Sequence, residues 1–233
     1  GKPFFLYFPL SAPHTPIVPT PDWAGKGKIG KYADFVAQTD GVVGAVIRAL
    51  EQNGIADETL VIFSADNGTS RAAGIDKLNA KGHYPSAERR GSKADLWDGG
   101  HRVPFIARWP GYIPAGTQTD QLICLSDFMA TFAEMFGVKF DERTAEDSES
   151  FLPGLLGEQS EKTRHTIIHH SFSGHFSIRE GNWKLLLASG SGGWSKPKEA
   201  EAIKKGLPDA QLYHVGDDPG ETRNLLEAHP ERV

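Results

Sequence analysis

The chain has 233 residues, 39% of them hydrophobic, with a formal net charge of −5 and a single cysteine. This length allows one large domain, or one domain with a smaller companion, and it is sufficient to bury a sizeable core. The negative charge and the lack of a Lys/Arg cluster argue against nucleic acid or an anionic membrane as partner. No apolar run is long enough to span a bilayer. One cysteine cannot form an internal disulfide.

The N-terminal residues predict a buried strand that leads into a rigid loop. Residues 4–8 form an apolar run, and Pro9 ends it. Because this run starts almost at once, we expect the chain to begin partway through a longer protein. His14 follows between Pro13 and Pro16, which stiffen the backbone. A histidine placed in this way suits a catalytic group and an ordinary surface loop equally well.

The next two elements predict a β-α-β unit. Residues 32–53 carry apolar side chains at helical spacing, and the Asn53-Gly54 pair is a typical end for a helix. Residues 59–65 form an apolar run without polar alternation, which is typical of a central parallel strand buried on both faces. We expect the crossover between the two strands to be right-handed.

Polar residues end this second strand abruptly, at Asp66, Asn67 and Gly68. Ligands of open α/β sheets bind at the carboxyl ends of the strands. A carboxylate beside an amide oxygen supplies two hard donors, which suit Ca²⁺ or Mg²⁺. The same three residues are also typical of an Asx turn that binds no ligand.

Residues 69–101 show no periodic pattern and are rich in Gly, Ser, Lys and Arg. A long loop of this kind in a compact domain is usually functional or disordered. Lys93 lies between small residues and could bind an anion through its ammonium charge. Arg102 could bind an anion through the paired N–H groups of its planar guanidinium. The alternative for both is a solvated surface cation.

The second half of the chain changes character. A third strand is predicted over residues 103–109 and a second helix within residues 122–136, before an acidic linker that begins at residue 141. Residues 190–198 are predicted to be a flexible Gly/Ser loop that carries Trp194. Four short strands predict an antiparallel meander, with a hairpin turn at residues 180–182: 166–170, 176–179, 183–187 and 212–215.

Several motifs together resemble those of the type I sulfatases, which are arylsulfatase-like members of the alkaline-phosphatase superfamily. The similarity covers essentially the whole chain in order. It rests on these segments: Pro13-His14-Thr15-Pro16, Ser64-Ala65-Asp66-Asn67-Gly68, Gly91-Ser92-Lys93, Trp97-Asp98-Gly99-Gly100-His101-Arg102, Ile178-Arg179-Glu180-Gly181-Asn182-Trp183-Lys184 and Asp218-Pro219-Gly220-Glu221.

The resemblance implies an α/β fold, with a partial, mostly parallel alkaline-phosphatase-like sheet flanked by helices and a small C-terminal antiparallel subdomain. On this basis residues 1–140 would be the C-terminal part of the catalytic domain, 141–160 a linker and 161–233 the C-terminal subdomain. The implied activity is hydrolysis of sulfate monoesters of carbohydrates or aryl alcohols. The family's compartments imply a periplasmic, secreted or lysosome-like location.

The resemblance also implies roles for single residues. Asp66 and Asn67 would be ligands of an active-site Ca²⁺, with Mg²⁺ as the alternative ion. His14 would contact the sulfate and the ester oxygen and donate a proton to the departing alcohol. Lys93 would neutralise a sulfate oxygen, and Arg102 is a further candidate for substrate binding.

The nucleophile is missing from this pattern. The family uses a formylglycine made from Cys or Ser in a Cys-X-Pro-X-Arg type segment, and neither Cys124 nor Ser86 has such surroundings. The family's early acidic metal ligands and its Lys-X-His segment also have no counterpart. We therefore expect the formylglycine in a missing N-terminal segment of the same protein, and no turnover by this chain alone. Asp98 stands where the family usually has Glu.

Two other interpretations remain open at this point. A phosphoesterase of the same superfamily is the nearer one, although such enzymes often carry a second-metal histidine where Asn67 stands. The other is a non-catalytic or degenerate fragment that binds carbohydrate through Trp194.

Overall fold

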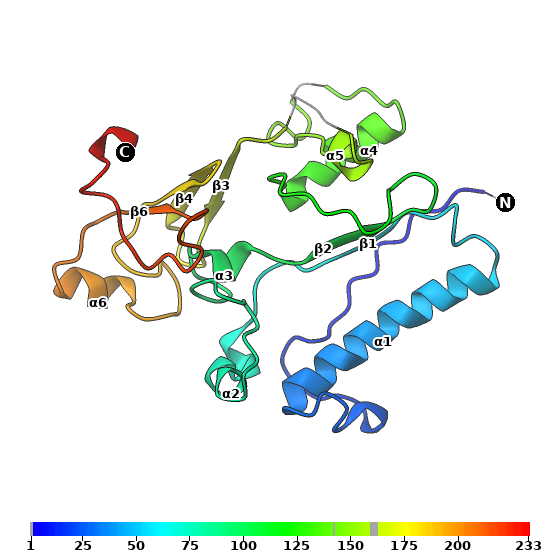
Figure 1. The fold of residues 1–233 in the computed structure, drawn as a ribbon, viewed down its shortest axis with the longest axis horizontal. Coiled ribbons are helices and arrows are strands. Elements are labelled where there is room, and N and C mark those ends of the chain that lie inside the picture. The colour runs from blue at the N-terminus through cyan, green and yellow to red at the C-terminus, as the bar shows by residue number, and fades with distance from the viewer. Residues whose placement is uncertain (1, 142, 159–162) are drawn as a thin grey trace. The chain divides into compact units, whose positions relative to one another are not determined.

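The computed structural model describes residues 2–141, 143–158 and 163–233. It divides into two compact units (Figure 1). Unit 1 comprises Gly1–Ala56 and Thr69–Pro85, and unit 2 comprises Asp57–Gly68 and Ser86–Val233. Among the described residues, no helix is both long and apolar enough to cross a bilayer.

Unit 1 is built around the long helix α1 (Lys31–Gln52). The predicted helix is confirmed, and Asn53 caps it, with its backbone N–H bonded to the carbonyl of Ala49. The buried Asp34 in the first turn accepts hydrogen bonds from the backbone of Gly25 and Gly27, at 3.0 and 2.7 Å. The unit also contains three short elements: η1 (Pro21–Trp23), η2 (Arg71–Ala73) and α2 (Ile75–Asn79).

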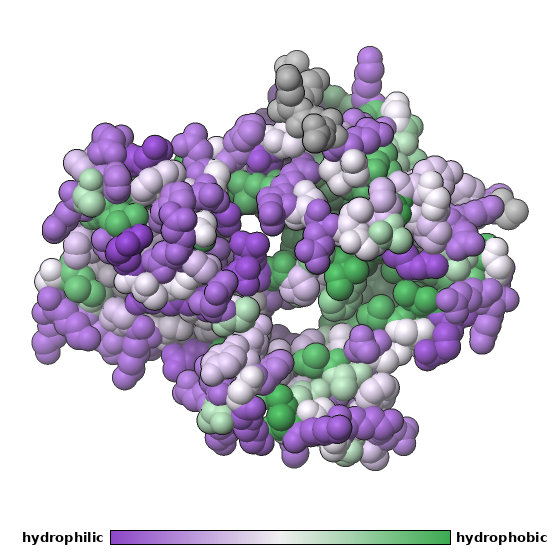
Figure 2. Space-filling model, viewed as in Figure 1, coloured by the Kyte–Doolittle hydropathy of each residue, from purple (hydrophilic) through white to green (hydrophobic). Residues whose placement is uncertain are grey.

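The predicted strand over residues 4–8 is wrong for this chain. These residues belong to no strand ladder of the described structure, and their five large apolar side chains are 54–78% exposed. A strand is stable only where a neighbouring strand completes its hydrogen bonds and covers its apolar face. Apolar residues gather in patches on the face seen in Figure 2 rather than lying only inside.

Unit 2 begins with strand β1 (Val61–Ser64), which pairs antiparallel with β2 (Phe105–Arg108). The two predicted strands are confirmed, but the parallel pairing and full burial predicted for the first are not. Every residue of β1 is half-buried, and β2 is the one strand paired with it in the described chain. A parallel neighbour requires a crossover from another strand, and the expected one at residues 4–8 does not form.

Three helical elements follow β2: η3 (Leu125–Asp127), α4 (Phe128–Met135) and α5 (Leu152–Leu155). The first two lie in the predicted second-helix region and confirm that helix. The third, α5, lies inside the predicted linker, of which residues 142, 159 and 160 are outside the described residues. The proposed domain limits at residues 140 and 161 stay a prediction.

The C-terminal meander is confirmed. Its four strands form one antiparallel sheet in the order β3-β4-β5-β6. The β4–β5 turn has Gly181 at φ +55°, a left-handed conformation that favours glycine. The helix α6 (Glu199–Lys204) lies between β5 and β6 in the chain, and η4 (Pro230–Arg232) comes after β6. The strands are β3 (Thr166–His170), β4 (Phe176–Glu180), β5 (Trp183–Leu186) and β6 (Gln211–His214).

The loop at residues 190–198 was predicted to be flexible. It is instead partly buried in unit 2 and held there by hydrogen bonds. Ser191 is fully buried, and its carbonyl accepts a 2.8 Å hydrogen bond from the backbone of Leu96. Its own N–H donates to the carbonyl of Pro197 at 2.9 Å. Glycine at position 190 allows the close approach, because a Cβ there would lie 2.6 Å from that same carbonyl oxygen. Small residues in this segment therefore serve packing rather than mobility.

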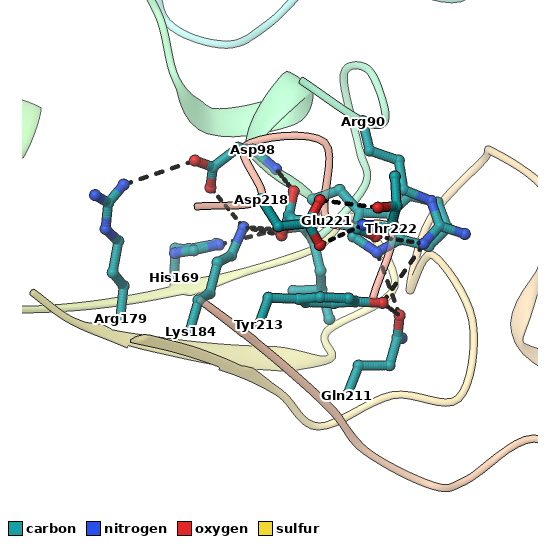
Figure 3. A network of polar contacts seen from close by, with 12 residues as sticks. Arg90, Asp98, His169, Arg179, Lys184, Gln211, Tyr213, Asp218, Glu221 and Thr222 are labelled. Carbon is teal, nitrogen blue, oxygen red and sulfur yellow. Dashed lines mark hydrogen bonds and ion pairs between the residues drawn. The ribbon is translucent and has the colours of Figure 1, made fainter. Parts of the chain in front are cut away.

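A buried lysine joins the meander to the short helix α3 (Asp98–His101). Lys184 of β5 has no exposed side-chain surface, and its Nζ lies 2.6 Å from Asp98 and 2.9 Å from Glu221 (Figure 3). It also donates to the carbonyl of Leu96 at 2.8 Å. Glu221 in turn accepts a 2.6 Å hydrogen bond from the backbone N–H of Asp98, at the start of α3.

The two carboxylates beside Lys184 respond differently to burial. Burial by itself would raise the pKa of Asp98, but the charge and hydrogen bond of Lys184 outweigh it and hold this pKa below its usual value. Burial raises the pKa of Glu221, and the opposite pull of Lys184 does not cancel that effect. Arg179 adds a second cation, 3.6 Å from Asp98.

A stacked histidine pair lies next to this cluster. The rings of His101 and His169 have centroids 3.9 Å apart. Burial lowers the pKa of His101 to about 4 and that of His169 to about 3, and the positive charge of Lys184 adds to both shifts. Both rings are therefore neutral at pH 7.

We expect replacement of Lys184 by Met to destabilise the protein by about 3–5 kcal/mol, because it leaves two buried carboxylates without their shared cation. Denaturant unfolding followed by tryptophan fluorescence measures this change. Lys204→Met on the exposed side of α6 is the matched control, and it should stay within about 0.5 kcal/mol. A loss below about 1 kcal/mol for Lys184→Met would contradict the central role of the ammonium group.

We expect the stability of unit 2 to fall as the pH drops from 7 to 5. Unfolded histidines take up protons near their ordinary pKa of about 6.5, whereas the folded His101 and His169 do so only near pH 4 and pH 3. The folded pKa values are depressed, so their stabilisation is present above pH 6.5 and is lost below it. For two half-buried groups this amounts to about 2 kcal/mol. Glu221, with its raised pKa, acts in the opposite sense.

The contribution of Glu221 to the pH dependence cancels when variants that all retain this residue are compared. Denaturant unfolding at pH 7 and pH 5 is measured for the protein, for the His101→Gln/His169→Gln double variant and for His165→Gln, whose histidine is exposed. The double variant should show a flatter pH dependence, and the control should behave as the unaltered protein. An unchanged slope in the double variant would refute the assignment.

Candidate functional site

The two glycines of α3 lie between the two segments that carry most of the predicted site. The N–H of Gly68, which follows Asp66 and Asn67, donates to the carbonyl of Gly100 at 2.9 Å. The N–H of Gly99 donates to the carbonyl of Arg90, which precedes the Lys93 turn, at 2.7 Å. A Cβ at Gly68 would lie 1.9 Å from the Gly99 oxygen, and a Cβ at Gly99 would lie 2.4 Å from the Gly91 oxygen. Only glycines permit this packing.

The Asp66–Asn67 segment leaves β1 as an exposed bend. Asp66 is exposed and Asn67 is half-buried. The Nδ2 of Asn67 donates to the carbonyl of Gly68 at 2.9 Å, so its Oδ1 is the atom left to accept. An exposed carboxylate beside an amide oxygen is a pair of hard donors that fits a cation such as Ca²⁺. Together they would supply two of the roughly six to eight oxygens that this ion requires.

Lys93 lies on a tight turn whose geometry depends on Asp95. Lys93 itself is half-buried, and the next residue, Ala94, has φ +85°. Asp95 is fully buried, and its carboxylate accepts hydrogen bonds from the backbone N–H and hydroxyl of Ser92 and from the backbone N–H groups of Trp194 and Ser195, at 2.8–3.3 Å. The hydroxyl of Ser195 donates to the same carboxylate. The turn is therefore fixed by hydrogen bonds from the loop at residues 190–198.

Two guanidinium groups lie near the C-terminal end of α3, with the carboxylates of Asp98 and Glu88 also close to one of them. Arg102, the first residue after the helix, is exposed. The nearby Arg89 is half-buried; burial lowers its pKa and the charge of Arg102 lowers it further. The Nε of Arg89 is buried without a hydrogen-bond partner in the part of the chain that the structure describes. Such a pair of guanidinium groups favours an anion over a cation at this end of the helix.

His14 belongs to unit 1, and its placement is described within that unit alone. The side chain is exposed, and Nδ1 lies 2.8 Å from the carbonyl of Thr15. A carbonyl only accepts, so Nδ1 carries the proton of this hydrogen bond. The ring is thereby held by one nitrogen, which leaves Nε2 for another partner.

The structure thus brings together some of the site residues that were predicted from the sequence. It places Asp66, Asn67, Lys93 and Arg102 on segments that all contact or continue α3. Sequence reasoning missed Asp95, Lys184 and Glu221, which hold these segments in position. The Gly99-Gly100 pair was the available signal, since adjacent glycines at a helix indicate close backbone approach. No group of three or more His, Cys, Asp or Glu residues that could hold a metal occurs within the described ranges.

Comparison with protein families gives two matches. A family model described as "Sulfatase" matches residues 1–138. A second model, described as "N-sulphoglucosamine sulphohydrolase, C-terminal", matches residues 92–191. The two overlap across the turn that carries Lys93 and the helix α3.

Curated relatives match the chain over its whole length. An N-acetylgalactosamine-6-O-sulfatase of Bacteroides thetaiotaomicron is 32% identical, over 100% of this chain and 45% of the relative. An N-acetylgalactosamine-6-sulfatase of Canis lupus familiaris is 27% identical, over 99% of this chain and 45% of the relative. The chain thus spans about half the length of the relatives it matches.

Solved structures of sulfatases are also similar to this chain. One from a study of the metabolism of multiple glycosaminoglycans by Bacteroides thetaiotaomicron has a TM-score of 0.84 and 32% identity, and it covers 100% of this chain and 48% of its own. A sulfatase from a Pseudoalteromonas species has a TM-score of 0.71 and 25% identity, with 91% and 42% coverage. These neighbours have the alkaline-phosphatase-like α/β fold, of which this chain forms a part, as predicted. Because the sulfatase model matches more than half of the residues, the chain belongs to the sulfatase family.

Proposed function

We propose that the full protein hydrolyses sulfate monoesters of carbohydrates, and that this chain supplies part of its active site. The observation that carries the proposal is the attachment of the Asp66–Asn67 bend and the Lys93 turn to the same short helix, α3. One segment offers hard oxygen ligands for a cation, and the other offers a cation for an anion. Cleavage of a sulfate monoester requires both kinds of group.

Lys93 is proposed to hold the sulfate group. Its turn is fixed by the buried carboxylate of Asp95, so the backbone that carries the ammonium group does not have to be ordered when the substrate binds. Charge on the sulfate oxygens changes as the sulfur–oxygen bond breaks, and a preorganised cation stabilises that change. Arg102 is proposed as a further contact for the same anion.

His14 is proposed as the acid that protonates the leaving oxygen. Its Nδ1–H is occupied by the carbonyl of Thr15, so proton transfer must use Nε2. The protonated ring donates from Nε2 to the alcohol oxygen as that oxygen departs, and the ring becomes neutral. A leaving group of high pKa needs this proton most.

The family implies a Ca²⁺ ion and a formylglycine in the full protein. Asp66 and Asn67 would bind the ion, which supplies positive charge to the sulfate and the nucleophile when bound. The nucleophile is proposed to lie in a missing N-terminal segment of the same protein, so the isolated chain should not turn over. The family's compartments support a periplasmic, secreted or lysosome-like location for the full protein.

A phosphoesterase remains the competing proposal for this fold. Asn67 favours the sulfatase, because an amide oxygen suits a single hard cation better than the paired transition metals of many phosphoesterases. The names of the relatives make 6-sulfated N-acetylgalactosamine the first substrate to test. Matched aryl sulfate and aryl phosphate then distinguish the two activities, and preference for the phosphate would overturn the proposal.

We expect Lys93→Ala and His14→Ala in the full protein to lower kcat/KM for sulfate esters by about 10²–10³ and 10²–10⁴ respectively, because each removes a group that acts in the transition state. The loss for His14→Ala should be larger with a sugar sulfate than with an aryl sulfate, whose phenolate leaves without a proton. Steady-state kinetics on both esters measure this.

The controls are exposed residues of the same type and unit. Lys205→Ala and His83→Ala should retain kcat/KM within about twofold. Equal activity of Lys93→Ala and the unaltered protein would show that the sulfate binds elsewhere.

We expect chelation of Ca²⁺ to abolish hydrolysis by the full protein, and added Ca²⁺ to restore it. Asp66→Ala should raise the Ca²⁺ concentration needed for half-maximal activity by about tenfold or more, because the ion loses its one charged ligand in this segment. Calorimetric titration of Ca²⁺ gives the same comparison without turnover. Asp209→Ala, which alters an exposed carboxylate elsewhere in unit 2, should leave both values unchanged; an unaltered Ca²⁺ affinity in Asp66→Ala would remove it from the ligand set.

A further inference from the structure

Two aromatic side chains from separate loops meet beside the Lys93 turn. Phe172 comes from the β3–β4 turn and Trp194 from the loop at residues 190–198. Their ring centroids are 5.1 Å apart with an interplanar angle of 56°. Phe172 is 73% exposed, although it is a large apolar residue in a well-bonded turn.

Both aromatics are attached directly to the Lys93 turn. The backbone N–H of Phe172 donates to the carbonyl of Ala94 at 3.0 Å. The backbone N–H of Trp194 donates to the Oδ1 of Asp95 at 2.8 Å. The attachment is close, because a Cβ at Gly193 would lie 2.2 Å from the Ala94 oxygen. The aromatic pair and Lys93 therefore belong to one rigid assembly.

The turn that carries Phe172 is itself fixed. Ser171 is almost completely buried, and its N–H donates to the carbonyl of His175 at 2.9 Å. Its hydroxyl accepts from the backbone N–H of His175 at 3.2 Å. The exposure of Phe172 is thus imposed by a well-held backbone and does not come from a loose loop.

We propose that Phe172 and Trp194 form a subsite for the pyranose ring of a sulfated sugar whose sulfate is held by Lys93. A pyranose has an apolar C–H face that packs on aromatic rings, and its sulfate carries the negative charge that Lys93 needs. The ligand class thus matches both chemistries of the assembly. The inference rests on the proposed sulfatase function and extends it to the part of the site that selects the sugar.

The test separates contacts with the sugar from contacts with the sulfate. In the full protein, Phe172→Ala/Trp194→Ala should raise KM for 6-sulfated N-acetylgalactosamine by about tenfold or more and leave kcat within about twofold. The inhibition constant of inorganic sulfate should not change, because sulfate contacts Lys93 and not the rings. Trp194→Phe should recover most of the affinity, because it keeps an aromatic face.

Phe136→Ala is the control, since Phe136 is equally exposed, at 74%, but lies after α4. An unchanged KM in the double variant would overturn the subsite. An equal rise in KM and in the inhibition constant of sulfate would also overturn it, by showing that the rings only position Lys93. If the unaltered protein does not hydrolyse the sugar sulfate, the proposed function fails on its own, and ligand-observed NMR of the sugar with the same variants still decides on the subsite.

Discussion

A lysine ammonium stays charged inside a protein only where carboxylates and carbonyls replace the water that it loses. Lys184 meets this condition with Asp98, Glu221 and the carbonyl of Leu96, all within 2.6–2.9 Å. Three distant parts of the chain converge on this one atom: the segment around α3, the meander, and the tail after β6. None of them can move away without leaving a charge unpaired in the interior.

The position of the candidate site follows from this constraint. Because Asp98 is held by its side chain to Lys184 and by its backbone to Glu221, the helix α3 starts at a fixed point. Gly99 and Gly100 then extend that position to both neighbouring segments through backbone contacts that have no room for a side chain. Asp98 thus joins α3 to the meander through its side chain, at 2.6 Å from the Nζ of Lys184.

Local patterns predicted the helix α1, the strands β1 to β6 and the turn at Gly181, because each depends on near neighbours in sequence. They failed where tertiary contacts decide. Residues 4–8 have strand composition but no ladder in the described chain, and the Gly/Ser composition of residues 190–198 concealed a buried, bonded loop. Asp95 could not be identified from the sequence, because three of its five donors belong to Trp194 and Ser195 and become neighbours only after the chain folds.

The loop at residues 190–198 shows how one segment can serve two purposes. Its backbone satisfies the carboxylate of Asp95, which fixes the Lys93 turn, while its side chain at Trp194 meets Phe172. The first role depends on backbone N–H groups, which every residue except proline supplies. The second depends on side-chain identity alone. Under the proposed subsite, a change of side chain at position 194 would alter the surface facing the sugar and leave the backbone contacts with Asp95 in place. Selection of the substrate would then be separate from the placement of Lys93.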